Sequence, residues 1–217
     1  MSTAYLKLET FRKYAAIFEN VKANETLKTA LAEHGYDDTA MEKGKALYDI
    51  ALEKLKIHQA TADKQKQASA NFTNALEAIR KTYASDRKKA KIIFDEQPET
   101  LSILGLKSGI SERVQASIEQ IEVFYTKLQA SEELRTPLEV LKITSQHINQ
   151  KAEEIQKVRK LYLTFLKEKG ESQNATKQKN AAFLEVDKWV KKFYSIAKIA
   201  LEEEPQLLEV IGKFVRS

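Results

Sequence analysis

KIIFDEQPETLSILGL occupies residues 91–106 of the chain, and KIALEEEPQLLEVIGK occupies residues 198–213. Both stretches begin with Lys-Ile, pass through an acidic run to a proline, and reach a glycine seven residues after that proline. Proline cannot continue a helix, and glycine readily takes the left-handed conformation that ends one. We therefore expect each stretch to end a long helix and to form a short one between proline and glycine.

The two stretches belong to a longer internal repeat. Residues 20–106 align with residues 127–213 without a gap when the sequence is shifted by 107 positions. Identical pairs in this alignment include Ala23/Ala130, Glu25/Glu132, Leu27/Leu134, Leu31/Leu138, Ala68/Ala175, Ala75/Ala182, Lys91/Lys198, Pro98/Pro205 and Gly105/Gly212. We expect two tandem helical repeats of about 107 residues, 1–106 and 110–217, which form one compact bundle and are joined by a short linker.

The composition predicts the fold class. The 217 residues include only six glycines and three prolines. Alanine, leucine, lysine, glutamate and glutamine dominate, and all of them are good helix formers. Apolar residues recur every seven positions in residues 41–90 and 148–197, a spacing typical of helices that pack at small crossing angles. The predicted fold is an all-α, elongated antiparallel helical bundle.

The middle of each long helical segment is polar and leaves two interpretations open. It reads QATADKQKQAS at residues 59–69 and EKGESQNATKQ at residues 168–178. The seven-residue spacing keeps its phase across both stretches, which favours one continuous helix in each repeat. A helix of that length is unusual, however, and Gly170 interrupts the second copy. The alternative is a hairpin that folds back near Asp63 and Gly170.

No residue pattern in the chain indicates catalysis, a cofactor or a metal site. There is no cysteine, and the three histidines occur outside the metal-binding motifs of helical proteins. His34 with Asp37 and Asp38 could hold a metal at a helix junction, but such a group is more typical of a turn before a helix. His58 falls on the apolar seam and is interpreted as a packed residue. No phosphate-binding glycine loop is present. We expect a protein that is not an enzyme and has no cofactor.

A basic stretch is the one candidate for nucleic-acid contact. Its residues are Arg80, Arg87, Lys88, Lys89 and Lys91. In a nucleic-acid complex these side chains would neutralise backbone phosphates. The second repeat has Asp187, Tyr194 and Ser195 at the positions of Arg80, Arg87 and Lys88. A duplicated nucleic-acid surface would keep its charges in both copies, and the net charge of the whole chain is only +5. A solvated helix face is therefore the preferred interpretation.

Three further motifs resemble those of known proteins. They are Gly35-Tyr36-Asp37 before a long helix, Ala175-Thr176 in the middle of the second one, and FYSIAKIALEEEPQLLEVIGKFVRS at residues 193–217. Together they are similar to a group of bacterial tandem-repeat, all-helical proteins that have no assigned activity. The resemblance covers most of the chain and is most specific at the C-terminal stretch. It implies the helical fold and transfers no functional residue.

These observations favour a non-enzymatic helical binding or scaffold protein that acts through protein–protein contacts, either with a partner or with a second copy of itself. A nucleic-acid-associated protein that uses residues 80–91 is the alternative. No run approaches the roughly 20 apolar residues needed to span a bilayer, and the first residues lack an apolar signal core. We therefore expect a cytoplasmic protein that does not engage a membrane.

Overall fold

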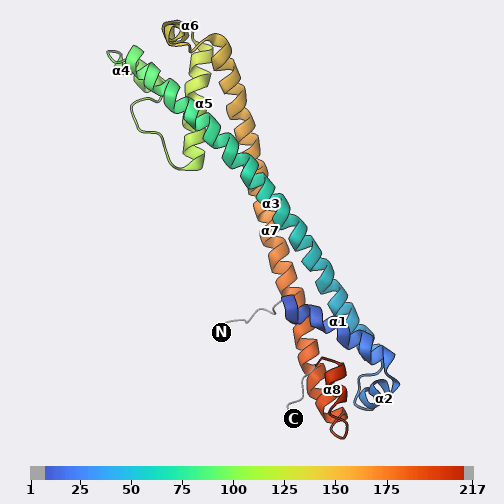
Figure 1. Cartoon of the computed structure of the whole chain (residues 1–217). Coiled ribbons are helices and arrows are strands. Elements are labelled where there is room, and N and C mark those ends of the chain that lie inside the picture. The colour runs from blue at the N-terminus through green and yellow to red at the C-terminus, as the bar shows by residue number, and fades with distance from the viewer. Residues whose placement is uncertain (1–7, 213–217) are drawn as a thin grey trace. The chain divides into compact units, whose positions relative to one another are not determined.

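The computed structural model describes residues 8–212, and every regular element in that range is a helix (Figure 1). The prediction of an all-α protein is confirmed. The elements are α1 (Leu8–Ala23), α2 (Glu25–Glu33), α3 (Asp38–Ile93), α4 (Pro98–Ile103), α5 (Val114–Ala130), α6 (Glu132–Arg135), the 3-10 helix η1 (Thr136–Leu141), α7 (Ser145–Ala200) and α8 (Leu207–Val210).

The two long helices are continuous. α3 and α7 contain 56 residues each, so the hairpin alternative near Asp63 and Gly170 is wrong. No proline falls within either helix, and the alanine, glutamine and lysine residues of the polar middle favour a helix. The hydroxyls of Thr61 and Thr176 donate to carbonyls one turn earlier, at 3.0 Å to Ile57 and 2.8 Å to Ser172. The threonine of each polar middle therefore satisfies its hydroxyl group within its own helix.

The helix bounds recur at the spacing of the sequence repeat. Asp38 and Ser145, which begin α3 and α7, lie 107 positions apart, as do Ile93 and Ala200, which end them. α1 and α5 end at Ala23 and Ala130, again 107 positions apart. The same local signals therefore start and stop the long helices in both halves of the chain.

Corresponding side chains and backbone conformations end the shorter elements. The side chains of Asn24 and Ser131 cap α2 and α6 by accepting from the backbone N–H groups of Leu27 and Leu134. Gly35 has a φ of 84°, and its counterpart Lys142 has a φ of 63°. Both repeats thus require a left-handed residue at this position, although only the first supplies a glycine.

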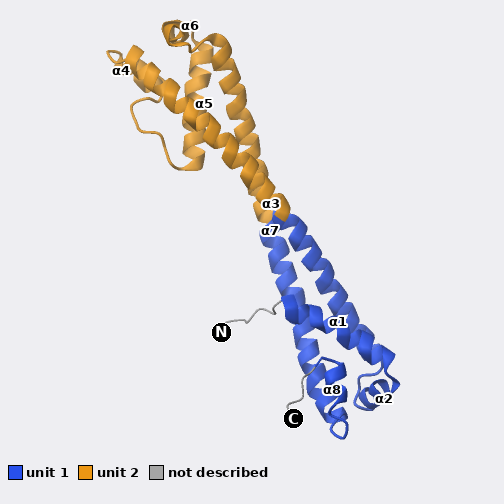
Figure 2. Ribbon diagram, in the orientation of Figure 1, with its two compact units in different colours: residues 1–62, 171–217 blue, residues 63–170 orange. Residues whose placement is uncertain are grey.

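Two compact units divide the chain, and they do not follow the repeat boundary (Figure 2). Unit 1 contains residues 1–62 and 171–217, and unit 2 contains residues 63–170. We expected the repeats 1–106 and 110–217 to be the units of one compact bundle. The division differs because α3 and α7 continue through their polar middles, so each long helix contributes its two halves to different units.

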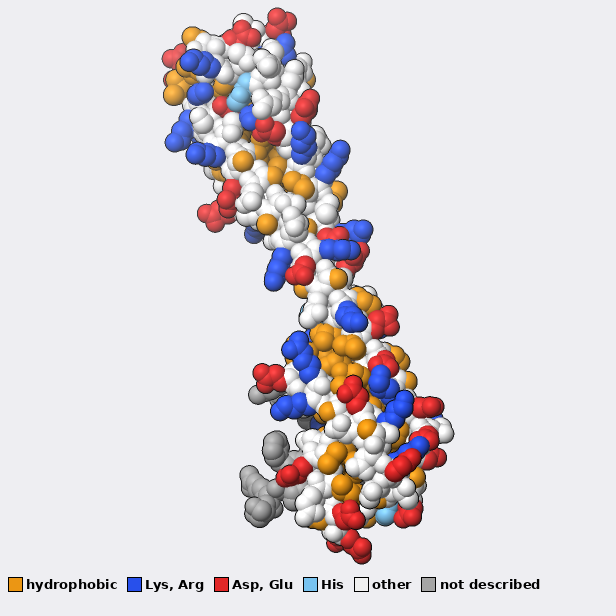
Figure 3. All heavy atoms as spheres, turned by 45° about the vertical axis from the view of Figure 1, so that its right-hand side comes forward, with side chains coloured by type: hydrophobic (Ala, Val, Ile, Leu, Met, Phe, Trp, Pro, Cys, Tyr) orange, Lys and Arg blue, Asp and Glu red, His pale blue; other side chains and the backbone are white. Residues whose placement is uncertain are grey.

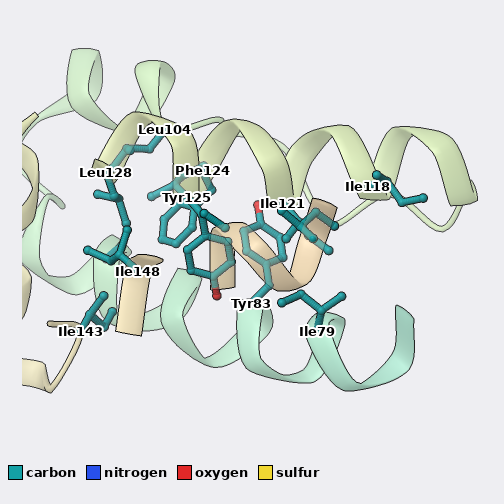
Figure 4. Packing of buried hydrophobic residues seen from close by; sticks show 14 of the residues in the cluster. Ile79, Tyr83, Leu104, Ile118, Ile121, Phe124, Tyr125, Leu128, Ile143 and Ile148 are labelled. Carbon is teal, nitrogen blue, oxygen red and sulfur yellow. The ribbon is translucent and has the colours of Figure 1, made fainter. Parts of the chain in front are cut away.

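Each unit has its own apolar core. In unit 1, Phe11 of α1 stacks on Tyr48 of α3 and Phe183 of α7, with ring centroids 4.7 and 4.3 Å apart. In unit 2, Tyr83 of α3 packs edge-on against Phe124 of α5 at 5.4 Å (Figure 4). Side chains from both sequence repeats therefore form the core of each unit.

Candidate functional site

The basic stretch at the C-terminal end of α3 is mostly engaged within unit 2. The Arg87 side chain is 6% exposed, and its guanidinium donates to the backbone carbonyls of Gly105, Leu106 and Ser108. Those carbonyls follow α4, so Arg87 fixes the segment that leaves this helix. The structure therefore gives Arg87 an internal role as a hydrogen-bond donor.

The other four basic residues of that stretch differ in exposure. Arg80 donates from Nε to the Ser117 hydroxyl at 2.8 Å and from Nη2 to the Ser111 carbonyl at 3.2 Å. Lys89 is half-buried, with its ammonium 4.0 Å from the Asp86 carboxylate, whereas Lys88 and Lys91 are exposed. The five residues predicted as a nucleic-acid contact do not lie together on one open face.

A buried polar cluster surrounds Asp86 in unit 2. One carboxylate oxygen of Asp86 accepts from the Tyr125 hydroxyl at 2.9 Å and lies 2.6 Å from His147 Nε2. Asp86 is 3% exposed and Tyr125 is fully buried. Burial first, and the Asp86 charge second, raise the pKa of Tyr125 above its ordinary value, so the phenol keeps its proton and donates to the carboxylate.

The equivalent positions of unit 1 carry no polar group. Phe193 corresponds to Asp86, Phe18 to Tyr125 and Ala40 to His147. Phe193 packs against Tyr36 with ring centroids 5.2 Å apart and stacks on Trp189 at 5.4 Å. The same helical framework therefore forms around an apolar set in one unit and a hydrogen-bonded polar set in the other, so the Asp86 cluster is not required by the fold.

Unit 1 has a buried aspartate at a different place. The Tyr14 hydroxyl of α1 donates to Asp187 of α7 at 2.8 Å, and Lys191 lies 2.5 Å from the same carboxylate. Burial first and the hydrogen bond to Asp187 second raise the pKa of Tyr14. In unit 2 the equivalent positions hold Ile121 and Arg80. The two buried aspartates are therefore not repeats of one another.

Gly44 and Trp189 form an unusually close helix contact in unit 1. A β-carbon at Gly44 would lie 2.3 Å from the Cζ2 atom of the Trp189 indole. Their counterparts in unit 2 are Lys151 and Thr82. The indole fits against α3 only because residue 44 has no side chain. This gives a physical reason for a glycine inside a long helix, where it otherwise lowers stability.

Each unit has a groove, and the two grooves correspond in part of their lining. A groove of about 510 Å³ in unit 1 is lined by Phe18, Glu19, Val21, Lys22, Lys28, Asp38, Met41, Glu42 and Lys45. A groove of about 380 Å³ in unit 2 is lined by Thr126, Gln129, Ala152, Glu153, Gln156, Lys157 and Lys160. Glu19, Lys22 and Lys45 correspond to Thr126, Gln129 and Ala152, so the two grooves overlap in part and differ in charge at these three positions.

Exposed apolar side chains recur in the two stretches that define the repeat. Ile92 and its counterpart Ile199 are 70% and 59% exposed. Ile103 and its counterpart Val210 are 50% and 40% exposed. Other exposed large apolar residues lack this correspondence, because Ile50 corresponds to Lys157 and Leu163 to Lys56. The stretches 91–106 and 198–213 thus present a large apolar residue at the same two positions.

The remaining candidate groups have local structural contacts. His34 lies 3.0 Å from the Ala30 carbonyl, and His58 lies 3.3 Å from the Thr176 hydroxyl. Within residues 8–212, no group of three or more His, Cys, Asp or Glu side chains is placed to hold a metal ion. No helix in the described part of the chain is long and apolar enough to cross a membrane. In Figure 3, basic and acidic side chains are interspersed over the visible face.

Comparison of the chain with protein-family models, with curated proteins and with solved structures finds no match in any of the three. The resemblance to bacterial tandem-repeat helical proteins therefore stays a prediction.

Proposed function

We propose that this protein is a non-enzymatic helical scaffold that binds protein partners through the exposed apolar residues of segments 91–106 and 198–213. The observation that carries the proposal is the exposure of Ile92 and Ile199 at equivalent positions in the two repeats. Exposed apolar side chains contribute little to folding but supply binding energy when a partner covers them. Their presence in both copies suggests one type of contact made twice.

The proposed architecture is a pair of tandem repeats that form an antiparallel bundle. Its support is the shared spacing of 107 positions between the bounds of α3 and α7. Gly105 and Gly212, which have φ values of 66° and 80°, provide the same helix stop in each repeat. A protein built in this way would offer the same binding surface once in each unit.

A non-enzymatic role is supported by the use of the buried polar residues. Asp86 is bonded by Tyr125 and His147, and Asp187 is bonded by Tyr14. These groups connect helices inside the units, so they are engaged with one another. Catalysis by a general acid and base would instead require them to face a site that a substrate can enter.

The nucleic-acid alternative is less well supported. The guanidinium groups of Arg80 and Arg87 donate to other groups of the protein. The exposed Lys88 and Lys91 are then the residues that could contact phosphate. Two phosphate contacts would give only a shallow dependence of binding on salt concentration. The experiment below therefore includes a nuclease treatment that distinguishes nucleic-acid binding from protein binding.

The test compares recovery of partners from the protein's own cells by three tagged forms of the full chain. The first is the wild type, and the second carries Ile92→Glu and Ile199→Glu. The third carries Ile50→Glu and Leu163→Glu, which also replace exposed apolar residues, at positions where the other repeat already has lysine. Each preparation is divided and treated with or without nuclease before the bound proteins are identified.

We expect a defined protein to remain with the wild type and the third form after nuclease and to be lost from the second form. Equal recovery by the second and third forms would contradict a role for Ile92 and Ile199. Loss from all three forms on nuclease treatment would instead favour the nucleic-acid alternative. Circular dichroism of the three forms before the experiment confirms that each is folded.

A further inference from the structure

The compact units place residues of the first repeat against residues of the second. Unit 1 joins residues 1–62 to residues 171–217, and unit 2 joins the later part of the first repeat to the earlier part of the second. A second copy of the chain would carry the same backbone. In principle its first repeat could therefore pack against another first repeat. The side chains at the contacts decide whether this like-with-like pairing can form.

The contact of Trp189 with Gly44 is possible in only one pairing. If two second repeats packed together, the indole of Trp189 would meet Lys151, the counterpart of Gly44. A β-carbon alone at that position would approach the indole to 2.3 Å, so a lysine cannot be accommodated without displacing the helix. If two first repeats packed together, Gly44 would face Thr82 and a void would remain where the indole lies.

The Asp86 cluster discriminates against pairing of two first repeats. In that pairing Asp86 would face Phe18 and Ala40, the counterparts of Tyr125 and His147. A carboxylate that is 3% exposed would then lose the phenol donor at 2.9 Å and the imidazole at 2.6 Å. Lys89 of the same helix, whose ammonium lies 4.0 Å from Asp86, would remain, but a buried carboxylate that loses both hydrogen-bond donors strongly disfavours this pairing.

The second buried aspartate discriminates against pairing of two second repeats. Asp187 accepts from Tyr14 of the first repeat at 2.8 Å. The second repeat has Ile121 at the position of Tyr14, and isoleucine has no hydrogen-bond donor in its side chain. In that pairing Asp187 would keep the ion pair with the exposed Lys191 of its own helix and would lose its buried donor. Asp86 and Asp187 thus disfavour the two like pairings separately, and each does so at a position where its own repeat lacks the donor.

We infer that the two repeats are mutually specific partners: the first repeat packs with the second and excludes a second copy of itself. The residues that set this choice are Gly44 with Trp189, Asp86 with Tyr125 and His147, and Asp187 with Tyr14. This inference rests on the repeat correspondence given above and is independent of partner binding through Ile92 and Ile199. Mutual specificity of the repeats explains why unit 2 buries the Asp86 cluster at positions where unit 1 has apolar residues.

The test uses the full chain with a protease site inserted between Gly109 and Ile110, beyond the carbonyls that Arg87 and Gln120 bind. The folded protein is cleaved there, unfolded in urea, refolded and examined by native mass spectrometry. We expect only the mixed pair of the two fragments. A statistical mixture that includes the two like pairs would overturn the inference. Fragments that separate on cleavage, before unfolding, would instead contradict the division into mixed units.

A second form of the same protein adds Asp86→Phe, Tyr125→Phe and His147→Ala, which give unit 2 the apolar set of unit 1. These side chains already pack in unit 1, so we expect this form to fold and, after cleavage, to yield a measurable fraction of paired first repeats. Pairing as selective as that of the wild type would overturn the role of the Asp86 cluster. The cleaved wild type tests mutual specificity even where the substituted form fails to fold.

Discussion

Gly44 and Trp189 are packed so closely that a β-carbon on Gly44 would lie 2.3 Å from the indole ring. Gly170, also inside a long helix, has open space where its β-carbon would be. The same substitution at the two glycines should therefore have opposite effects. Gly44→Ala adds an atom to a filled contact, and Gly170→Ala only improves helix propensity.

We expect Gly44→Ala to destabilise the protein by about 1–3 kcal/mol and Gly170→Ala to stabilise it by about 0.5–1 kcal/mol. Urea unfolding followed by circular dichroism measures both changes. Trp189 is the single tryptophan of the chain, so its fluorescence reports on unit 1 during the same titration. A shift in the same direction for both variants would contradict the assigned contact.

Lys142 has a left-handed backbone, with a φ of 63°, at the position where the first repeat has Gly35. The left-handed conformation costs a residue with a side chain about 1–2 kcal/mol, and it costs glycine less. Lys142→Gly should therefore stabilise the protein by about 0.5–1 kcal/mol. Thermal unfolding measures the change.

Gly35→Ala makes the opposite change, because it adds a side chain at the left-handed residue of the first repeat, and should destabilise the protein by about 1 kcal/mol. Gly109→Ala is a matched control, because Gly109 has open space around it and no left-handed φ. Its unfolding temperature should stay close to that of the wild type. Equal effects of the substitutions at Gly35 and Gly109 would show that the backbone strain has been misassigned.

Arg87 and Lys88 are neighbours in sequence but differ in their environments. Replacing Arg87 with methionine keeps an apolar stem and removes the donors to the carbonyls of Gly105, Leu106 and Ser108. The loss of donors to these carbonyls, of which that of Leu106 is buried, should destabilise the protein by about 1–3 kcal/mol. Lys88→Met, on the exposed side of α3, should change stability by less than about 0.5 kcal/mol.

These two variants also distinguish a structural role of the basic residues from a role in nucleic-acid binding. If residues 80–91 bound phosphate, Lys88→Met would weaken binding and reduce its dependence on salt without affecting folding. A stable Arg87→Met protein, together with a change in nucleic-acid affinity, would place Arg87 on an accessible surface and contradict its burial.

His58 should make the protein less stable in acid. Burial, followed by the nearby charge of Lys179, lowers the pKa of His58 in the folded state. The unfolded chain then binds a proton near pH 6.5 that the folded chain does not hold, so stability falls as the pH drops through about 6.5. His58→Phe, which introduces the residue found at the equivalent Phe165, removes this proton uptake.

We expect the wild type to lose more stability than His58→Phe between about pH 7.5 and 5.5, as measured by urea unfolding at each pH. Direct titration of the imidazole by NMR provides an independent check. Parallel loss of stability in the two proteins, or a His58 pKa at or above the ordinary value, would contradict the assigned environment.

The fold class and the helix ends could be predicted from the sequence because they depend on local signals. Pro98, Gly105 and Gly35 act through their own backbones, and the seven-residue spacing of apolar residues sets the face that packs. Whether the polar middle bends could not be predicted, because its residues are compatible with either a hairpin or a continuous helix.

The arrangement of side chains at the candidate site was less predictable. Asp86 continues the series Phe72 and Ile79 at a spacing of seven, so a charged residue on an apolar seam was a visible signal. Its partners Tyr125 and His147 come from two other helices, and no local pattern relates them. Arg87 belongs to a basic run in the sequence, and sequence alone does not reveal that its guanidinium donates to three carbonyls.

The exposed apolar site is proposed to occur twice, so the stoichiometry of the partner complex is the decisive measurement. Native mass spectrometry of the purified chain with the recovered partner counts the partner molecules bound. We expect two partner molecules per wild-type chain, one for Ile92→Glu or Ile199→Glu alone, and none for the double variant. A single bound partner that persists in the double variant would rule out a site formed by Ile92 and Ile199.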